Sequence, residues 1–115
     1  MSEQESPPKV LWEIDSTHPE EATRIRQACK EVVDPEMGLN VVELGLVRQV
    51  AVQDGQAHIR MILTTPFCPY GPALLEMTRS KIEQAAGLPA RIELSPEPWD
   101  PGMMEDSAAA NWGFF

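Results

Sequence analysis

Apolar side chains recur along the middle of the chain with two kinds of spacing, and each predicts an element of secondary structure. Residues 18–33 carry apolar side chains at helical spacing on one face and predict a helix. Residues 41–52 and 57–64 are rich in β-branched and alternating apolar residues and flank Asp54-Gly55, a strong hairpin signal. The pattern therefore predicts a helix followed by two antiparallel strands.

A second helix and a third strand follow. Residues 72–87 repeat the helical spacing in a stripe widened by Leu74 and Met77, and end on Gly87, a typical helix C-cap. Residues 90–94 alternate again and predict a strand parallel to the second one, reached by a crossover through the helix. Two helices on one face of a three-stranded mixed sheet make a two-layer α+β domain, in the order helix, strand, strand, helix, strand.

The length of 115 residues fits one domain and is too short for two ordinary ones. Residues 1–15 are acidic and contain proline, and we expect them to form a flexible tail, with residues 16–115 as a single domain with a C-terminal extension. Trp12 and Ile14 belong to a small apolar island in this tail, which could dock on the domain or on a partner.

Charge and hydropathy exclude several classes of partner. The net charge is −9, with 18 acidic against nine basic residues and no basic cluster, so nucleic acid is not an expected partner. No apolar run approaches the roughly 20 residues that cross a bilayer, and the N-terminus lacks a signal pattern, so we expect no membrane association and a cytoplasmic location.

The two cysteines, Cys29 and Cys68, are expected to be free thiols in a reducing compartment. No CxxC, HExxH or Cys/His cluster is present, which argues against a self-contained zinc site. Cys29 lies on the apolar face of the first predicted helix and is interpreted as a core residue.

Cys68 occurs in a different context, the segment TTPFCPYGP between the second predicted strand and the second predicted helix. A sulfur just before a helix can face its free N–H groups and positive end, which favour the thiolate, and the surrounding prolines restrict the backbone. Thr64 and Thr65 add two hydroxyl groups that can donate to a thiolate or to a bound anion. The alternative is a small buried cysteine in an ordinary turn.

Three acidic residues, two before the first predicted strand and one near its start, are candidates for the same edge of the sheet. Asp34 and Glu36 could orient a metal or accept a proton from a thiol, or simply form a polar turn after the helix. Glu43 lies between apolar residues and is either exposed at an edge or paired in the site.

Three segments resemble a known family in order along the chain. DPEMGLNVVELGLV, LTTPFCPYGPAL and PEPW are similar to segments of the small iron-sulfur cluster assembly factors that include SufT and PaaD, over about residues 20–113. The resemblance implies an α+β domain in which Asp34, Glu36, Thr64, Thr65 and Cys68 share one pocket. The chain lacks the extra cysteine-rich C-terminal segment of the PaaD branch, so the general assembly branch fits better.

The resemblance implies a non-enzymatic factor that helps to mature iron-sulfur proteins, with iron or a transient cluster as cargo and Cys68 as its ligand. One thiolate per chain cannot supply the four ligands of a cluster, so a client apoprotein, a carrier or a second copy in a homodimer would share it. Two alternatives remain open: a thiol enzyme with Cys68 as nucleophile or redox centre, and an adaptor whose apolar ends grip another protein.

Overall fold

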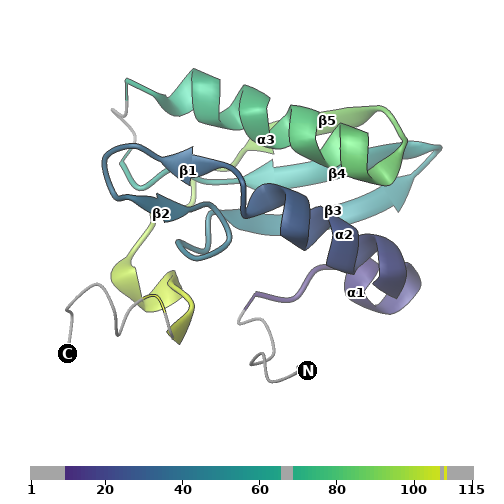
Figure 1. Cartoon of the computed structure of the whole chain (residues 1–115), viewed down its shortest axis with the longest axis horizontal. Helices are drawn as coiled ribbons and strands as arrows, with labels where there is room; N and C mark the ends of the chain where they lie inside the picture. The colour runs from purple at the N-terminus through teal and green to yellow at the C-terminus, as the bar shows by residue number, and fades with distance from the viewer. Residues whose placement is uncertain (1–9, 66–68, 107, 109–115) are drawn as a thin grey trace.

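The computed structural model describes residues 10–65, 69–106 and 108 of the chain (Figure 1). Its helices are α1 (Ile14–Thr17), α2 (Pro19–Cys29), α3 (Gly71–Ala86) and the 3-10 helix η1 (Pro101–Met103). Its strands are β1 (Val33–Asp34), β2 (Leu39–Asn40), β3 (Val47–Gln53), β4 (Gln56–Met61) and β5 (Ala90–Leu94).

The strands β3, β4 and β5 form one sheet in that order, antiparallel between β3 and β4 and parallel between β4 and β5. The chain passes from β4 to β5 through α3, and α2 packs along α3, so that the two helices cover one face of the sheet (Figure 1). Arg60, Arg91 and Glu93 are exposed on the other face. The predicted two-layer α+β fold is confirmed.

The hairpin between β3 and β4 turns at Asp54 and Gly55, with φ angles of 53° and 73°. Positive φ at both central residues is the signature of the two-residue turn that Asp-Gly favours, as the sequence predicted. The register shifts between Val47 and Gln49, which marks a bulge. Val47 and Val50 are consequently both buried, opposite Met61 and Ile59 of β4.

The first long helix is shorter than the sequence predicted. It was expected to reach residue 33, but α2 ends at Cys29. The next residues instead form β1, which pairs antiparallel with β2, and the N–H of Val41 donates to the carbonyl of Val32 at 3.0 Å. These backbone hydrogen bonds compete with a further helical turn, so the helix stops at Cys29 and does not reach residue 33.

The apolar island near the N-terminus is docked on the domain. Trp12 is 4% exposed and Ile14 is fully buried. The indole N–H of Trp12 donates to the carbonyl of Val47 at 3.0 Å, and the guanidinium of Arg26 lies 4.0 Å from the centre of its ring. Residues 10–15 therefore pack as part of the folded domain rather than as the expected tail, while residues 1–9 lie outside the described residues.

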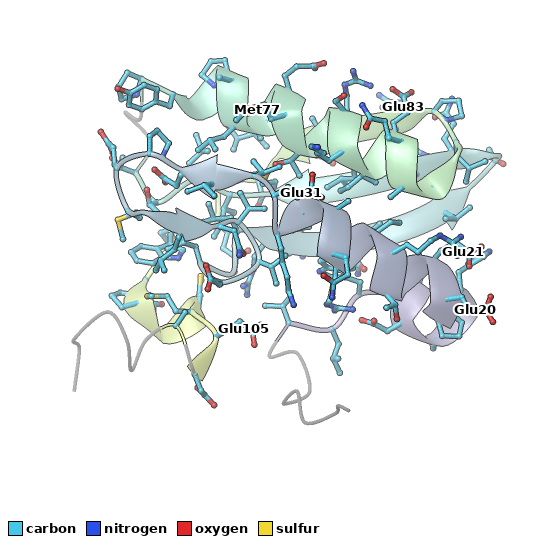
Figure 2. All side chains as sticks on the ribbon, viewed as in Figure 1. Glu20, Glu21, Glu31, Met77, Glu83 and Glu105 are labelled. Carbon is cyan, nitrogen blue, oxygen red and sulfur yellow. The ribbon has the colours of Figure 1, made fainter. Side chains whose placement is uncertain are left out.

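The core lies between the two long helices and the sheet. Its helical residues are Ala22, Ile25 and Cys29 of α2 and Leu74, Thr78 and Ile82 of α3. Met77 was expected to widen the apolar stripe of α3, but its side chain is 44% exposed (Figure 2). Gly87 caps α3 with φ +69°, and its N–H donates to the carbonyl of Glu83, as predicted.

After β5 the chain continues without regular structure into η1, and Met104 is fully buried. Asp106 and Ala108 are helical, and residues 107 and 109–115 lie outside the described residues. Among the residues that the structure describes, no helix has the length and apolar character needed to span a bilayer.

Candidate functional site

The short β1–β2 pair places the acidic motif Asp34-Pro35-Glu36 in a tight turn. The Oδ1 atom of Asp34 accepts a hydrogen bond from the N–H of Glu36 at 2.8 Å, which closes a turn over Pro35. The chain returns through Gly38, whose φ is +71° and whose N–H donates to the carbonyl of Asp34 at 2.8 Å. The side chain of Glu36 is exposed. The motif therefore forms a turn that holds one carboxylate and presents another to solvent.

Asp34 is an unusual residue energetically, because an acidic side chain is rarely buried and that of Asp34 is 0% exposed. Its Oδ2 atom has no hydrogen-bond partner among the described residues. A buried oxygen without a partner costs about 1–3 kcal/mol, and the turn uses only the Oδ1 atom, so the described hydrogen bonds do not account for the second oxygen. The missing partner of Oδ2 therefore indicates an interaction with a group outside the described residues.

Thr64 and Thr65 follow β4, and both are half-buried. This end of β4 and the turn between β1 and β2 lie at the same end of the molecule in the view of Figure 1. Thr64 also lines an apolar groove of about 400 Å³ formed where β4 and β5 end. Its lining residues are Leu63, Thr64, Leu94, Ser95, Pro96, Glu97, Pro98 and Trp99.

Leu63, just after β4, and Gly71, at the start of α3, are in close contact. Gly71, the first residue of α3, is buried, and a Cβ atom placed on it would lie 2.7 Å from Cδ1 of Leu63. The start of α3 is thus in close contact with the end of the preceding strand, and only glycine fits without a shift of Leu63.

Cys68 occupies the third position before the first residue of α3, close to the helix start that the sequence predicted. Residues 66–68 lie outside the described residues. The predicted proximity of its sulfur to Asp34 and to the N–H groups of α3 therefore remains a prediction.

Glu43 has a structural partner. Its Oε1 atom accepts the N–H of Asn40 at 2.9 Å, and the Oδ1 atom of Asn40 accepts the N–H of Glu43 at 2.8 Å. This reciprocal pair is the arrangement of a capping box, and it fixes the turn that follows β2. The pairing therefore supports the loop, and a role of Glu43 in the site remains a prediction.

The second cysteine, Cys29, is a core residue, as predicted. It is a free thiol, 0% exposed, and burial raises its pKa to about 12. It is therefore protonated at neutral pH, and a protonated buried thiol is neither a nucleophile nor a metal ligand. Within the described ranges, no group of three or more His, Cys, Asp or Glu side chains is arranged to hold a metal ion.

The C-terminal segment holds the loop after β2, a relationship that the sequence analysis missed. Trp99 donates its indole N–H to the carbonyl of Leu44 at 2.7 Å, and the N–H of Glu105 donates to the carbonyl of Glu43 at 2.9 Å. Gly45 has φ +73°, and a Cβ atom on it would overlap the carbonyl oxygen of Met103. Gly45 was the residue in the sequence that could have indicated this contact, because only glycine allows the backbone of Met103 to approach so closely.

Residues 22–93 match the model of a family described as iron-sulfur cluster assembly proteins. The chain belongs to this family. The matched range contains all the candidate site residues, from Asp34 to Cys68, and ends before Trp99.

Two curated relatives support the assignment. An Fe-S protein maturation auxiliary factor of Porphyromonas gingivalis is 39% identical over 88 residues, which cover 74% of this chain and 84% of that protein. The Fe-S protein maturation auxiliary factor SufT of Staphylococcus aureus is 38% identical over 77 residues, 64% of this chain and 86% of SufT. The predicted family and its role as an Fe-S protein maturation factor are confirmed.

Solved structures agree on the fold. A conserved hypothetical protein of Thermotoga maritima matches with a TM-score of 0.67 and 32% identity, covering 79% of this chain and 92% of that one. A domain of unknown function from Bacillus anthracis matches with a TM-score of 0.75 over 86% of this chain and 97% of its own, at 21% identity. This second likeness shows the α+β fold alone.

Proposed function

We propose that Cys68 is the residue through which this iron-sulfur assembly factor binds its cargo, iron or a labile cluster. The observation that supports the proposal most is the burial and protonation of Cys29. The sequence has two cysteines, and Cys29 is buried and protonated. Any thiolate chemistry of the chain therefore falls to Cys68.

The neighbours of Cys68 in the proposed site have complementary roles. The carboxyl groups of Asp34 and Glu36 set the local charge, and the Oδ2 atom of Asp34, which has no hydrogen-bond partner among the described residues, takes part in the site. The hydroxyl groups of Thr64 and Thr65 and the first N–H groups of α3 steady the sulfur. Glu43 contributes through the loop that it caps.

A single thiolate makes transfer a better description than storage, because a cluster normally has four protein ligands. The remaining ligands would come from a client apoprotein or a carrier. One relative, named as an iron-sulfur cluster carrier protein in Synechocystis, is 32% identical over 59 residues, which make up 17% of the carrier. A segment similar to about half of this chain (51%) thus also occurs within a longer carrier, which supports a role in handing over cargo without turnover of a substrate.

Anaerobic reconstitution with iron and sulfide tests the proposal. The native chain and the Cys29→Ala variant are expected to gain visible cluster absorption and bound iron, and the Cys68→Ser variant is expected to lose most of both. Cys29→Ala is the matched control, because it removes a thiol that is buried in the core.

Maturation of an apo-client enzyme completes the test. Cys68→Ser is expected to lower the rate of client activation, while Cys29→Ala leaves it unchanged. A Cys68→Ser variant that binds iron and activates clients as well as the native chain would refute the proposal. Steady turnover of a small substrate by Cys68 without iron would favour the thiol enzyme instead.

A further inference from the structure

The strand β5 forms one edge of the sheet, and its backbone groups divide into two sets. The N–H of Ala57 donates to the carbonyl of Pro89, and the N–H of Ser95 donates to the carbonyl of Met61. Backbone groups alternate along a strand, so residues 91 and 93 also face β4, and residues 90, 92 and 94 face away from it.

Most of the backbone groups of β5 that face away from β4 have no hydrogen-bond partner among the described residues. Glu83 lies near the C-terminal end of α3 (Figure 2), and its Oε2 atom accepts the N–H of Ala90 at 3.3 Å, as expected for a residue that faces away from β4. Among the residues that the structure describes, the backbone groups of Ile92 and Leu94 have no hydrogen-bond partner on this side. The opposite edge is protected, because Trp12 donates to the carbonyl of Val47 in β3.

We propose that the edge of β5 pairs with β5 of a second copy of the chain, antiparallel and centred on Ile92. A two-fold axis at Ile92 sets Ala90 opposite Leu94 of the partner subunit, and these outward-facing residues form the hydrogen-bonded pairs. In the dimer the N–H of Ala90 exchanges its 3.3 Å bond to the side chain of Glu83 for the backbone carbonyl of Leu94 of the partner subunit. The result is a continuous sheet across both subunits.

Charge complementarity selects this occupant and this orientation. In the antiparallel register, Arg91 lies opposite Glu93 of the partner subunit, and the two-fold axis repeats the pair. These are the non-hydrogen-bonded positions, where side chains approach most closely and opposite charges attract. A parallel pairing in register would instead set Arg91 against the same residue of the partner.

The other face of β5 fits the same arrangement. Leu94 is 50% exposed, and the opposing Ala90 of the partner subunit is small enough to leave room for it. Edge strands that avoid pairing carry charges that repel a second copy. The sequence ARIEL does the reverse, because its two opposite charges are symmetric about Ile92.

Sedimentation equilibrium of the full chain, at concentrations up to about 1 mM, tests the pairing through charge reversal. Arg91→Glu and Glu93→Arg each place like charges opposite one another, and each is expected to raise the dimer dissociation constant about tenfold or more. An equimolar mixture of the two single variants restores both opposite-charge pairs, and so does the double variant. Both samples are expected to dimerise as the native chain does.

Two controls make the result specific. Arg24→Glu, on α2, changes the net charge by the same amount as Arg91→Glu and is expected to leave the dissociation constant unchanged. Thermal unfolding checks that each variant is folded, since Arg60 neighbours residue 93 on β4. Amide hydrogen exchange provides a local readout: protection of Ile92 and Leu94 should rise with concentration, and that of Val50 should not.

Two results would overturn the proposal: a single-chain mass at every concentration, or a dimer that the single charge reversals do not weaken. The proposal does not depend on Cys68, so Cys68→Ser is expected to dimerise normally.

Discussion

Trp99 and Leu44 are joined by a hydrogen bond of 2.7 Å from the indole N–H to the backbone carbonyl, across 55 positions of the sequence. With the bond from Glu105 to Glu43, it fixes the C-terminal segment on the loop that follows β2. That loop continues directly from the β1–β2 pair that holds Asp34. The C-terminal segment is therefore structural support for the candidate site.

Gly45 is the most sensitive position of this contact. Alanine at this position would have to adopt φ +73° and would overlap the carbonyl oxygen of Met103. We expect Gly45→Ala to lower the free energy of unfolding by about 3 kcal/mol, the sum of the left-handed backbone and the overlap. Urea denaturation measures it as a lower midpoint.

Gly38→Ala is the matched control for Gly45→Ala. Gly38 has φ +71°, but a Cβ atom there meets nothing within 4 Å, so only the backbone cost of about 1 kcal/mol applies. Equal losses at the two positions would show that the contact with Met103 contributes nothing.

The sequence predicted the sheet and both long helices because each has a strong local signal. Asp54-Gly55 specifies its turn through backbone conformation alone, and Gly87 ends α3 in the same way. The end of α2 has no such signal, since it depends on β1 pairing with β2, a tertiary choice. The bulge after Val47 is also invisible locally, because alternation would place Val47 and Val50 on opposite faces.

The candidate site was less predictable than the fold. Motif resemblance identified Asp34, and the turn around it uses its side chain, but the burial of the carboxylate could not be read from a polar DPE segment. Glu43 shows the converse, since its spacing from Asn40 fits a capping box that was not recognised in the sequence. The hydrogen bond from Trp99 to Leu44 could not be predicted from the sequence, because it depends on two distant chain segments meeting.

Asp15 gives a pH-dependent contribution to stability. Hydrogen bonds from the guanidinium of Arg26 lower the pKa of Asp15 below its usual value of 3.8, against a smaller opposing effect of burial. A carboxyl group with a lowered pKa stabilises the fold above its unfolded pKa, and this contribution is lost as the pH falls through the folded value. We expect Asp15→Asn to cost about 1 kcal/mol at pH 7, with the difference from the native chain shrinking below about pH 4.

Urea midpoints of the native chain and Asp15→Asn between pH 7 and pH 2.5 measure this difference. Glu13→Gln, an exposed acidic residue nearby, controls for the loss of one negative charge. A difference that stays constant down to the lowest pH would mean that Asp15 acts through packing rather than through its ionised form.

The two thiols are expected to differ sharply towards an alkylating reagent. Cys29 is fully buried with its pKa raised to about 12, so it should react only when the chain unfolds. Iodoacetamide at pH 8 is expected to add one label to the native chain, at Cys68, and a second label in denaturant, as measured by mass spectrometry. The Cys68→Ser variant should remain unlabelled until it is unfolded, and rapid native labelling of that variant would contradict the assignment of Cys29 to the core.

Asp34 allows a test of whether its carboxyl group is kept for function at the expense of stability. Asp34→Asn preserves the Oδ1 acceptor for the N–H of Glu36 and replaces the buried, unpartnered oxygen with an amide nitrogen. If the carboxyl group serves the site, the variant should be as stable as the native chain, within about 1 kcal/mol, and should activate client enzymes more slowly. Glu36→Gln changes an exposed side chain in the same turn and is the control for a general loss of charge. A turn that needs only the Oδ1 acceptor of Asp34 would tolerate the amide. An Asp34→Asn variant that unfolds more readily yet activates clients normally would therefore show that the carboxyl group itself has a structural role.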